Sequence, residues 1–214
     1  MPRAPSLEPE RGDARSRLLA AARDVIRRQG FTGCSVEEVC RTAGVTKGAF
    51  FHHFPSKEAL GVAAAQDWAG ATGAFFAAAP YHTHPDPLAR VLAYIDFRGE
   101  IAAGEIAAFT CLVGTMAQEV YASSPAIRDA CAASIFGHAE TLAADIQAAM
   151  DARSLTPEWT AASLARHTQA VLQGAFILAK AGDDPALVQE SVAHLRRYVE
   201  NLFENARDKE KRDD

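Results

Sequence analysis

Cysteine and histidine are the residues of this chain best suited to binding a metal or to acting as nucleophile and base. The four cysteines form no CxxC pair, and His82 and His84 lie in a proline-containing loop with no third ligand nearby in the sequence. Glu190 and His194 occur as a single pair, whereas a di-iron helical bundle requires repeated Glu-x-x-His motifs. The sequence also lacks phosphate-binding loops, dinucleotide fingerprints and nucleophile elbows. We therefore expect a protein that is not an enzyme and has no metal site and no cofactor, although a cysteine–histidine pair assembled by folding stays open.

Three neighbouring residues have the types and spacing that suit contact with DNA. Lys47 can reach a phosphate or a base edge, Gly48 lets the backbone approach closely, and the methyl group of Ala49 suits thymine. They follow Thr46, which can cap a helix, and Gly44, where a sharp turn requires a positive φ. Two short helices joined by such a glycine turn form a helix-turn-helix, whose second helix enters the DNA major groove.

The segments Thr32–Val39 and Ala43–Leu60 resemble the DNA-binding head of the tetracycline-repressor (TetR) family. The resemblance implies an all-helical, two-domain homodimer in which three N-terminal helices bind a palindromic double-stranded DNA operator. It also implies that the remaining helices form a pocket for a small-molecule effector and the dimer interface. Most members of this family are repressors that the effector releases from DNA.

The same resemblance implies roles for individual residues of the head. The residues expected to contact DNA are Thr46, Lys47, His52 and Lys57 for the phosphate backbone, and Gly48 and Ala49 for the bases. Phe51 stands where the family usually has a tyrosine, so the phosphate contact of that hydroxyl is missing and we expect Phe51 to pack inside the domain. Phe50 and Phe54 are expected in the core because phenylalanine is commonly buried.

The distribution of charge agrees with a DNA-binding head on a different kind of body. The net charge is −5, but residues 1–60 contain 10 Lys and Arg against 7 Asp and Glu, whereas residues 61–214 contain 12 against 20. The modest basic excess near the N-terminus suits a nucleic-acid partner. Residues 1–17 contain no apolar core of a signal peptide, and no uncharged run suits a membrane span. We therefore expect a cytoplasmic protein with no membrane partner.

Helix signals extend along most of the chain. Of the 214 residues, 45 are alanine, which is the strongest helix former and a poor strand former. An Asp, Ser or Thr precedes proline at four places and predicts helix starts near residues 87, 125, 157 and 185, and Ser35–Glu38 is a capping box. We predict an all-α fold of nine helices, at residues 14–29, 36–43, 47–53, 57–78, 87–103, 106–122, 125–151, 157–181 and 185–205.

These helices divide into two domains with flanking segments. A helix-turn-helix DNA-binding domain is predicted at 14–58 and a ligand-binding and dimerisation domain at 59–205. A flexible N-terminal arm at 1–13 and a charged tail at 206–214 flank them.

The second domain is expected to carry the dimer interface and the effector pocket. The last two predicted helices have small faces and a 4-3 apolar spacing that suits a partner subunit, although a seam within one chain is the alternative. The predicted interface residues are Leu164, Val171, Leu178, Val188, Val192, Leu195, Val199 and Leu202. Sparse large residues among many alanines can leave a cavity. The predicted pocket residues are Trp68, Phe76, Phe97, Cys111, Gln118, His138 and His167.

Cys111 lies in Phe109–Glu119, a segment that resembles a TetR subgroup with a cysteine near the start of its sixth helix. Some members of that subgroup sense electrophiles or oxidants through this thiol, and a helix N-terminus can make a thiol more nucleophilic. A buried, inert thiol is the alternative. The sequence therefore predicts a ligand-responsive transcriptional regulator, in the first place a repressor that binds a palindromic operator as a dimer. The alternative is a helical ligand-binding dimer without specific DNA binding.

Overall fold

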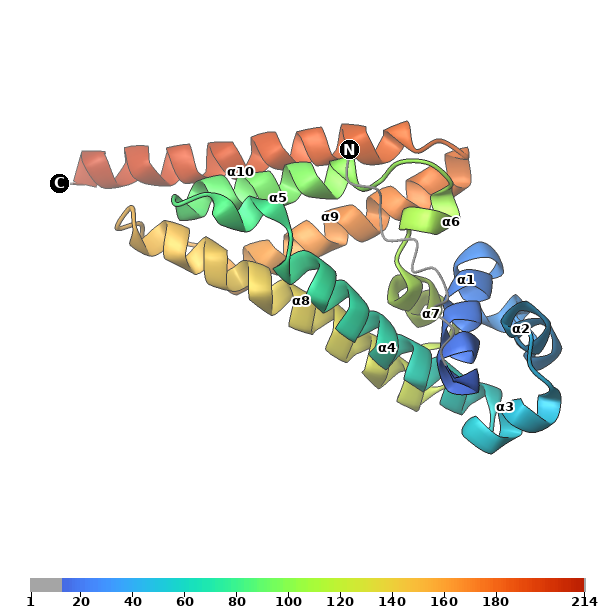
Figure 1. Ribbon diagram of the computed structural model, residues 1–214. Coiled ribbons are helices and arrows are strands. Elements are labelled where there is room, and N and C mark those ends of the chain that lie inside the picture. The colour runs from blue at the N-terminus through green and yellow to red at the C-terminus, as the bar shows by residue number, and fades with distance from the viewer. Residues whose placement is uncertain (1–12, 214) are drawn as a thin grey trace. The chain divides into compact units, whose positions relative to one another are not determined.

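The computed structural model describes residues 13–213, with side chains described for residues 13–206, and every regular element in this part of the chain is a helix (Figure 1). The predicted N-terminal arm lies outside the described residues except for Asp13. The described chain forms two compact units: a head unit of residues 13–75 and 107–135, and a body unit of residues 76–106 and 136–213. The head unit is larger than the predicted domain at 14–58 because residues 59–75 and 107–135 also belong to it.

The helices follow one another with short connections. The elements are α1 (Ala14–Gly33), α2 (Val36–Ala43), α3 (Lys47–His53), α4 (Lys57–Ala77), the 3-10 helix η1 (Pro80–Thr83), α5 (Pro87–Glu100), α6 (Ile106–Phe109), α7 (Leu112–Val120), α8 (Pro125–Asp151), α9 (Ala161–Gly182) and α10 (Ala186–Asp213).

The structure confirms an all-helical fold and corrects three of the predicted helices. Residues 106–122 form α6 and α7 rather than one helix, because Cys111 has extended backbone and caps α7. The described residues therefore contain ten α-helices, not nine. Helix α9 begins at Ala161 instead of 157, and α10 continues to Asp213 through most of the residues predicted as a charged tail.

Polar caps begin these helices, although not always the predicted ones. The prediction was right at Asp86, whose carboxylate accepts the N–H of Ala89 at 3.1 Å. It was wrong near residue 157, because Thr160 and Ser163 form a reciprocal capping box in which each side chain accepts the other's backbone N–H at 3.1 Å. Two satisfied N–H groups make the later start the better one.

The head unit surrounds one apolar core, to which α1, α2, α3, α7 and the first parts of α4 and α8 contribute. Phe31, Phe50 and Phe54 are buried in it, Phe50 completely, as predicted for the last two. Gly61 allows α4 to approach closely, because a Cβ there would lie 2.8 Å from Phe31 and 2.9 Å from Ile127 of α8. The short helix α3 is therefore held in place by packing in a shared core, because a helix of this length is not stable on its own.

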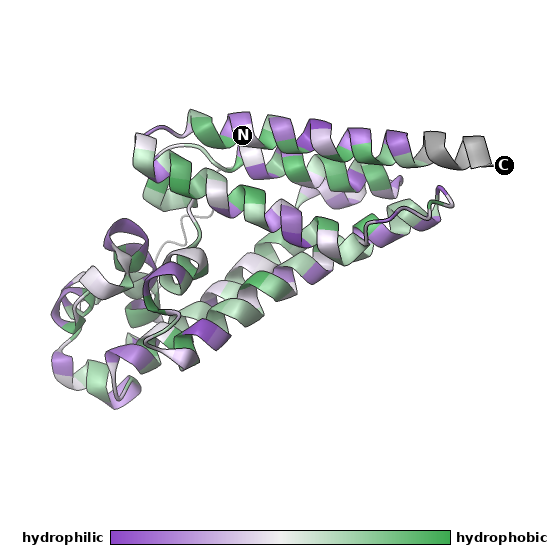
Figure 2. Cartoon of the chain, turned by 180° about the vertical axis from the view of Figure 1, so that it is seen from behind, coloured by the Kyte–Doolittle hydropathy of each residue, from purple (hydrophilic) through white to green (hydrophobic). Residues whose placement is uncertain are grey.

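In the body unit, α10 lies along both α5 and α9, as the red, green and orange helices of Figure 1 show. Helix α5 comes close to α10 at Gly99, where a Cβ would lie 3.2 Å from a methyl group of Val192. Figure 2 shows hydrophilic and hydrophobic residues interspersed along the long helices. Within the described part of the chain, no helix is long and apolar enough to span a bilayer.

Replacing Gly44 with alanine should destabilise the head unit. Gly44 ends α2 with φ 63° and ψ 40°, a left-handed conformation in which a Cβ clashes with the neighbouring backbone. We expect Gly44→Ala to lower the free energy of unfolding by about 1–2 kcal/mol. Urea denaturation followed by circular dichroism measures this change.

Gly73→Ala is the matched control within the same unit. Gly73 lies inside α4, and no atom lies within 4 Å of the position that its Cβ would take. Alanine there should raise the free energy of unfolding by about 0.5–1 kcal/mol, because it is the better helix former. Equal effects of the two substitutions would contradict the special role of the left-handed turn.

Candidate nucleic-acid interface

Side-chain hydrogen bonds cap the starts of α2 and α3, the two helices that flank the turn. Ser35 Oγ accepts the N–H of Glu38 at 3.1 Å, which is one half of the predicted capping box. Thr46 Oγ1 accepts the N–H of Ala49 at 3.1 Å at the start of α3. Between them, Gly44 supplies the left-handed residue. Helices α2 and α3 therefore have the arrangement of a helix-turn-helix.

One side of α3 is buried and the other is exposed. Phe50 has no exposed surface, whereas Lys47, Gly48 and His52 are exposed and Ala49 is half-buried. An exposed lysine beside an exposed glycine offers a charge and a point of close backbone approach on one surface. Both features suit a helix that inserts into a DNA groove.

Phe51 corrects one prediction. It was expected inside the head unit, but 55% of its surface is exposed, and its ring meets the Phe50 ring edge-on with centroids 5.1 Å apart. Successive helical residues point about 100° apart, so Phe50 on the buried side turns Phe51 away from the core. Because Lys47 lies four residues earlier, the Phe51 ring shares the exposed face of α3 with that lysine.

The two predicted lysines have different surroundings. Lys47 is exposed, and its ammonium group pairs with Glu37 of α2 and lowers the pKa of that carboxyl group. Lys57 Nζ donates to the carbonyl oxygen of Thr32 at 3.3 Å and lies 4.6 Å from the centre of the Phe31 ring. Lys57 therefore fastens the start of α4 to the end of α1, and Lys47 is the more available cation.

Arg41 is an exposed cation that the sequence reasoning did not single out. Its side chain is 76% exposed in the last turn of α2, with a nitrogen 3.6 Å from the Glu38 carboxylate. The signal that could have found it is helical spacing: Val39, Cys40 and Ala43 form the buried side of α2, which places position 41 on the outer side.

Two family models match the chain, one over the helix-turn-helix region and one over the C-terminal part. One is described as "Bacterial regulatory proteins, tetR family" and matches residues 18–64, and the other is described as "Tetracyclin repressor-like, C-terminal domain" and matches residues 87–209. The chain belongs to the TetR family. The second match covers more than half of the chain, so membership of the TetR family does not depend on the DNA-binding head alone.

Curated relatives within the TetR family are similar to this chain over a short segment. The HTH-type transcriptional repressor NemR of Escherichia coli strain K12 is 49% identical over 51 residues, which make up 24% of this chain and 26% of NemR. The HTH-type transcriptional regulator UidR of the same strain is 36% identical over 55 residues, or 26% of this chain and 28% of UidR. These matches therefore span only about a quarter of the length of the curated relatives.

Solved structures show the same fold over nearly the whole described chain. The reduced form of E. coli NemR has a TM-score of 0.72 at 28% sequence identity, over 89% of this chain and 97% of that one. The regulatory protein TetR from Rhodobacter sphaeroides has a TM-score of 0.77 at 23% identity, over 87% of this chain and 98% of that one. The head and body of this TetR-family member therefore each follow a known architecture.

Cys111 lies at a helix start, as predicted, but as the residue before α7 rather than in its first turn. Its Sγ accepts the N–H of Gly114 at 3.4 Å. Arg27 Nε donates to the carbonyl oxygen of the preceding Thr110 at 3.0 Å, and the guanidinium lies 5.0 Å from the centre of the Trp68 ring. Burial lowers the pKa of Arg27 to about 10, so a cation still stands beside Cys111 at neutral pH.

The other three cysteines are buried in the head unit. Burial raises the pKa of each of these thiols, that of Cys131 to about 12. A neutral, enclosed thiol is a poor nucleophile. Cys111, which is half-buried, is therefore the cysteine of this chain with access to solvent.

The predicted pocket residues fall in different parts of the molecule. Phe76, Phe97 and His138 gather in the body unit, with the centroid of the Phe76 ring 6.0 Å from that of Phe97 and 4.5 Å from that of His138. The remaining predicted residues are Trp68, Cys111 and the exposed Gln118 of the head unit, and the exposed His167 of α9. Exposure removes Gln118 and His167 from an interior pocket, which corrects the prediction for both.

A cluster of polar side chains next to these rings was largely missed. Tyr94 Oη accepts hydrogen bonds from Arg98 Nη1 and Gln169 Nε2, both at 3.0 Å, and lies 2.9 Å from His138 Nε2. Burial, followed by the charge of Arg98, lowers the pKa of His138 to about 4, so the imidazole is neutral at pH 7. Because Tyr94 Oη already accepts two hydrogen bonds, its own proton is donated to Nε2 of the neutral imidazole. The available signal was the i, i+4 spacing of Tyr94 and Arg98 on one helix face.

Most of the predicted dimer-interface residues lie inside the body unit of a single chain. The buried ones are Leu164, Val188, Val192, Leu195 and Val199, each at most 6% exposed. Their seam packs within the chain because α10 lies against α5 and α9. This corrects the prediction for these residues in favour of the alternative, a seam within one chain. Val171 and Leu202 are half-buried, and Leu178 is 54% exposed.

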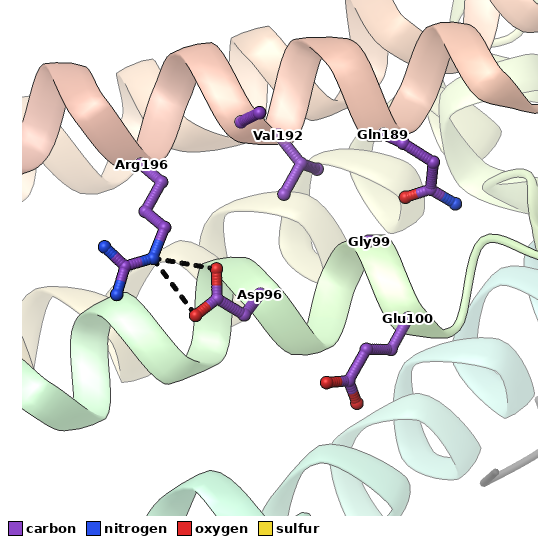
Figure 3. Close-up of a pocket in the computed structure, with 7 residues that line it drawn as sticks. Asp96, Gly99, Glu100, Gln189, Val192 and Arg196 are labelled. Atoms are coloured by element: carbon purple, nitrogen blue, oxygen red, sulfur yellow. Dashed lines mark hydrogen bonds and ion pairs between the residues drawn. The ribbon is translucent and has the colours of Figure 1, made fainter.

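An open groove of about 600 Å³ lies between α5 and α10 (Figure 3). Its lining residues are Asp96, Gly99 and Glu100 from α5, and Gln189, Val192, Ala193 and Arg196 from α10. Arg196 Nε donates to both carboxylate oxygens of Asp96, at 3.0 and 3.1 Å, and the guanidinium also pairs with Glu200. With its arginine already neutralised by two carboxylates, this groove is not the candidate effector site.

The pKa of His138 predicts how the stability of the body unit changes with pH. His138 binds a proton near pH 6.5 when unfolded but only near pH 4 when folded, so protonation favours the unfolded state between these values. Stability should therefore fall as the pH drops from 6.5 to 4, with up to roughly 3 kcal/mol due to this residue. Urea denaturation at several pH values measures the loss. In His138→Gln, which cannot titrate, the loss over this range should be smaller, and an identical pH dependence would refute the assignment.

Proposed function

We propose that the chain is a DNA-binding transcriptional regulator, in the first place a repressor, that binds a palindromic operator as a homodimer and responds to a small molecule. The observation that carries the proposal is the helix-turn-helix, whose second helix buries Phe50 and exposes Lys47, Gly48 and His52. NemR, which is 49% identical over 51 residues, is named a transcriptional repressor. Binding to chromosomal DNA would place the protein in the cytoplasm.

The proposed DNA contacts follow from the exposure of each side chain. Lys47 and His52 would meet phosphates, and Gly48 would let the backbone of α3 approach the base edges, beside the half-buried methyl of Ala49. The hydroxyl of Thr46 caps α3, so this residue would meet a phosphate through its backbone. Lys57 would contact a phosphate only after releasing its carbonyl partner.

A gel-shift assay with the DNA upstream of the protein's own gene tests specific binding. Affinity should fall steeply with salt, because lysine and arginine displace counterions from phosphates. Specific, salt-sensitive binding supports the regulator. Its absence would favour the second reading, a helical ligand-binding dimer without specific DNA binding.

Lys47→Ala should weaken DNA binding without unfolding the head unit. Lys47 is exposed, and its partner Glu37 is exposed too, so little of the fold depends on the pair. We expect the affinity to fall about tenfold and the salt dependence to become shallower by about one phosphate contact per subunit. Fluorescence anisotropy at several salt concentrations measures both quantities.

Arg28→Ala is the charge-matched control. Arg28 belongs to α1 of the same unit, is about half exposed and pairs with Asp24 one turn away. Its loss removes the same charge from the head unit, so an equal fall in affinity would mean that binding follows net charge and not the surface of α3.

The dimer interface is proposed on the exposed side of α9 and α10. Ile177, Leu178 and Tyr198 are large apolar residues that are 47%, 54% and 45% exposed. Gly174 of α9 has no atom within 4 Å of its Cβ position, so another helix can come close there. A two-fold dimer would bring two copies of α3 to one face of DNA, where half-sites lie about 34–36 Å apart.

Leu178→Glu should convert the dimer to monomers, because two buried glutamates would have no partners in the interface. Phe136→Glu, at a position of α8 with the same exposed fraction of 54%, is the matched control and should stay dimeric. Analytical ultracentrifugation measures the mass. A dimeric Leu178→Glu protein would exclude this side of α9 as the interface.

The effector is proposed to act through α4, which begins directly after the recognition helix and ends at Ala77. A ligand can change DNA affinity only by binding two states of the protein differently. Cys111 gives a second candidate route, because a half-buried thiol beside the Arg27 cation could react with an electrophile or oxidant. The similar structure of NemR is that of its reduced form.

A further inference from the structure

Arg98 is a buried cation that has no anionic partner among the described residues. Its side chain lies in the body unit and is 7% exposed. Of its donors, Nη1 binds Tyr94 Oη at 3.0 Å and lies 3.5 Å from His138 Nε2, whereas Nε is buried and has no hydrogen-bond partner among the described residues. Buried charges are normally paired, because burial without a counter-charge is costly.

Three aspartates of the body unit are paired with other arginines. The ion pairs of the body unit that involve α5, or the residue before it, are Asp86 with Arg153, Arg90 with Asp145, and Asp96 with Arg196. Arg98 lies on the same helix, yet no carboxylate of the described residues lies within ion-pairing distance of it. Among the described residues, Arg98 is therefore left without a counter-ion, although other arginines of the body unit have one.

The polar neighbours of Arg98 do not neutralise it. Tyr94 Oη accepts from Arg98 and from Gln169 and gives its own proton to His138, so the hydroxyl is fully used. The imidazole is neutral at pH 7 because burial and the Arg98 charge lower the pKa of His138 to about 4. The hydrogen-bonded cluster thus carries one positive charge and no negative charge.

Aromatic rings surround this cation. The guanidinium carbon lies 5.2 Å from the ring centre of Phe76, 5.7 Å from that of Phe176 and 5.8 Å from that of Tyr94. The rings of Phe97 and Tyr81 adjoin them, 5.7 Å apart. Such rings would favour a cationic ligand, but the guanidinium already occupies that position and would repel one. A flat apolar molecule with one negative charge fits both features.

We propose that Arg98 and these rings bind an aromatic carboxylate as the effector, with the carboxylate on the Arg98 guanidinium and the ring among Phe76, Phe97 and Phe176. The guanidinium fork matches a carboxylate and gives the free Nε donor its acceptor. Phe76 and His138 are half-buried, so the cluster reaches the surface there. Phe76 lies in the last turn of α4, the helix through which the effector is proposed to act, so a ligand that displaces Phe76 would act on α4. As an effector site, this inference rests on the proposed function.

Isothermal titration calorimetry on the full chain, without DNA, tests the site. The probes are sodium benzoate and sodium 2-naphthoate, their neutral amides benzamide and 2-naphthamide, and the cation benzyltrimethylammonium. We expect at least one acid to bind once per chain and to raise the melting temperature. Its amide should bind at least tenfold more weakly, because it offers no charge to the guanidinium.

Arg98→Met keeps the apolar length of the side chain. This variant should bind the acid and its amide with equal affinity, and it should bind the acid at least tenfold more weakly than the wild-type protein does. Arg98→Lys keeps the charge but not the fork and should retain part of the preference for the acid. Arg166→Met, at an exposed arginine of α9, is the matched control and should bind like the wild type.

The inference is overturned if neither acid binds at millimolar concentration, if amide or cation binds as tightly as acid, or if Arg98→Met keeps the preference for the acid. The acid-to-amide comparison in the wild-type protein needs no variant, so it decides even where a variant misfolds. Because no DNA is present, failure here leaves the DNA-binding proposal intact, and failure of the gel-shift assay leaves the anion site intact.

Discussion

The exposed face of α3 depends on the burial of Phe50 behind it. A helix of seven residues is not stable alone in water, because the cost of nucleation exceeds the return from so few hydrogen bonds. Phe50 is completely buried and Phe54 nearly so, and each contributes about 2–3 kcal/mol by leaving water. The residues proposed to face DNA are thus held by residues that would never touch it. The same anchoring forces Phe51 outward, into the position from which it could meet DNA.

Local signals in the sequence were enough to predict much of the head. The ends of α2 and α3 are set by local residues: the side chains of Ser35 and Thr46 cap the helix starts, and the left-handed backbone of Gly44 ends α2. These helices begin and end where predicted. The same kind of signal misled near residue 157, where two capping sequences lie four residues apart. A Thr-Pro pair satisfies one backbone N–H, whereas the Thr160–Ser163 box satisfies two. A choice between neighbouring caps depends on the total of hydrogen bonds, which a single motif does not show.

Partners distant in the sequence could not be predicted in this way. The 4-3 spacing of Val188, Val192 and Leu195 indicates that α10 packs against another helix, but spacing does not say whether that helix belongs to the same chain. For Arg98 the sequence shows a cation on a helix. Only the fold shows that Arg98 donates to Tyr94, which also accepts from Gln169, and that no carboxylate of the described residues pairs with Arg98. The aromatic part of this site could be predicted from the sequence, since Phe76, Phe97 and His138 were expected to line a pocket.

The net charge of the chain is a poor guide to what it binds, because each cation acts through its own surroundings. Lys47 is exposed and paired with Glu37, so a phosphate can take the place of that carboxylate at little cost in either direction. Such an exchange suits reversible binding that salt can modulate. Arg98 is buried and pairs with no carboxylate of the described residues, so an anion that reaches it supplies the missing counter-charge. The two cations are therefore suited to different anions. The exposed Lys47 of the head suits the phosphates of DNA bound at the surface, and the buried Arg98 of the body suits a small anion enclosed in the protein.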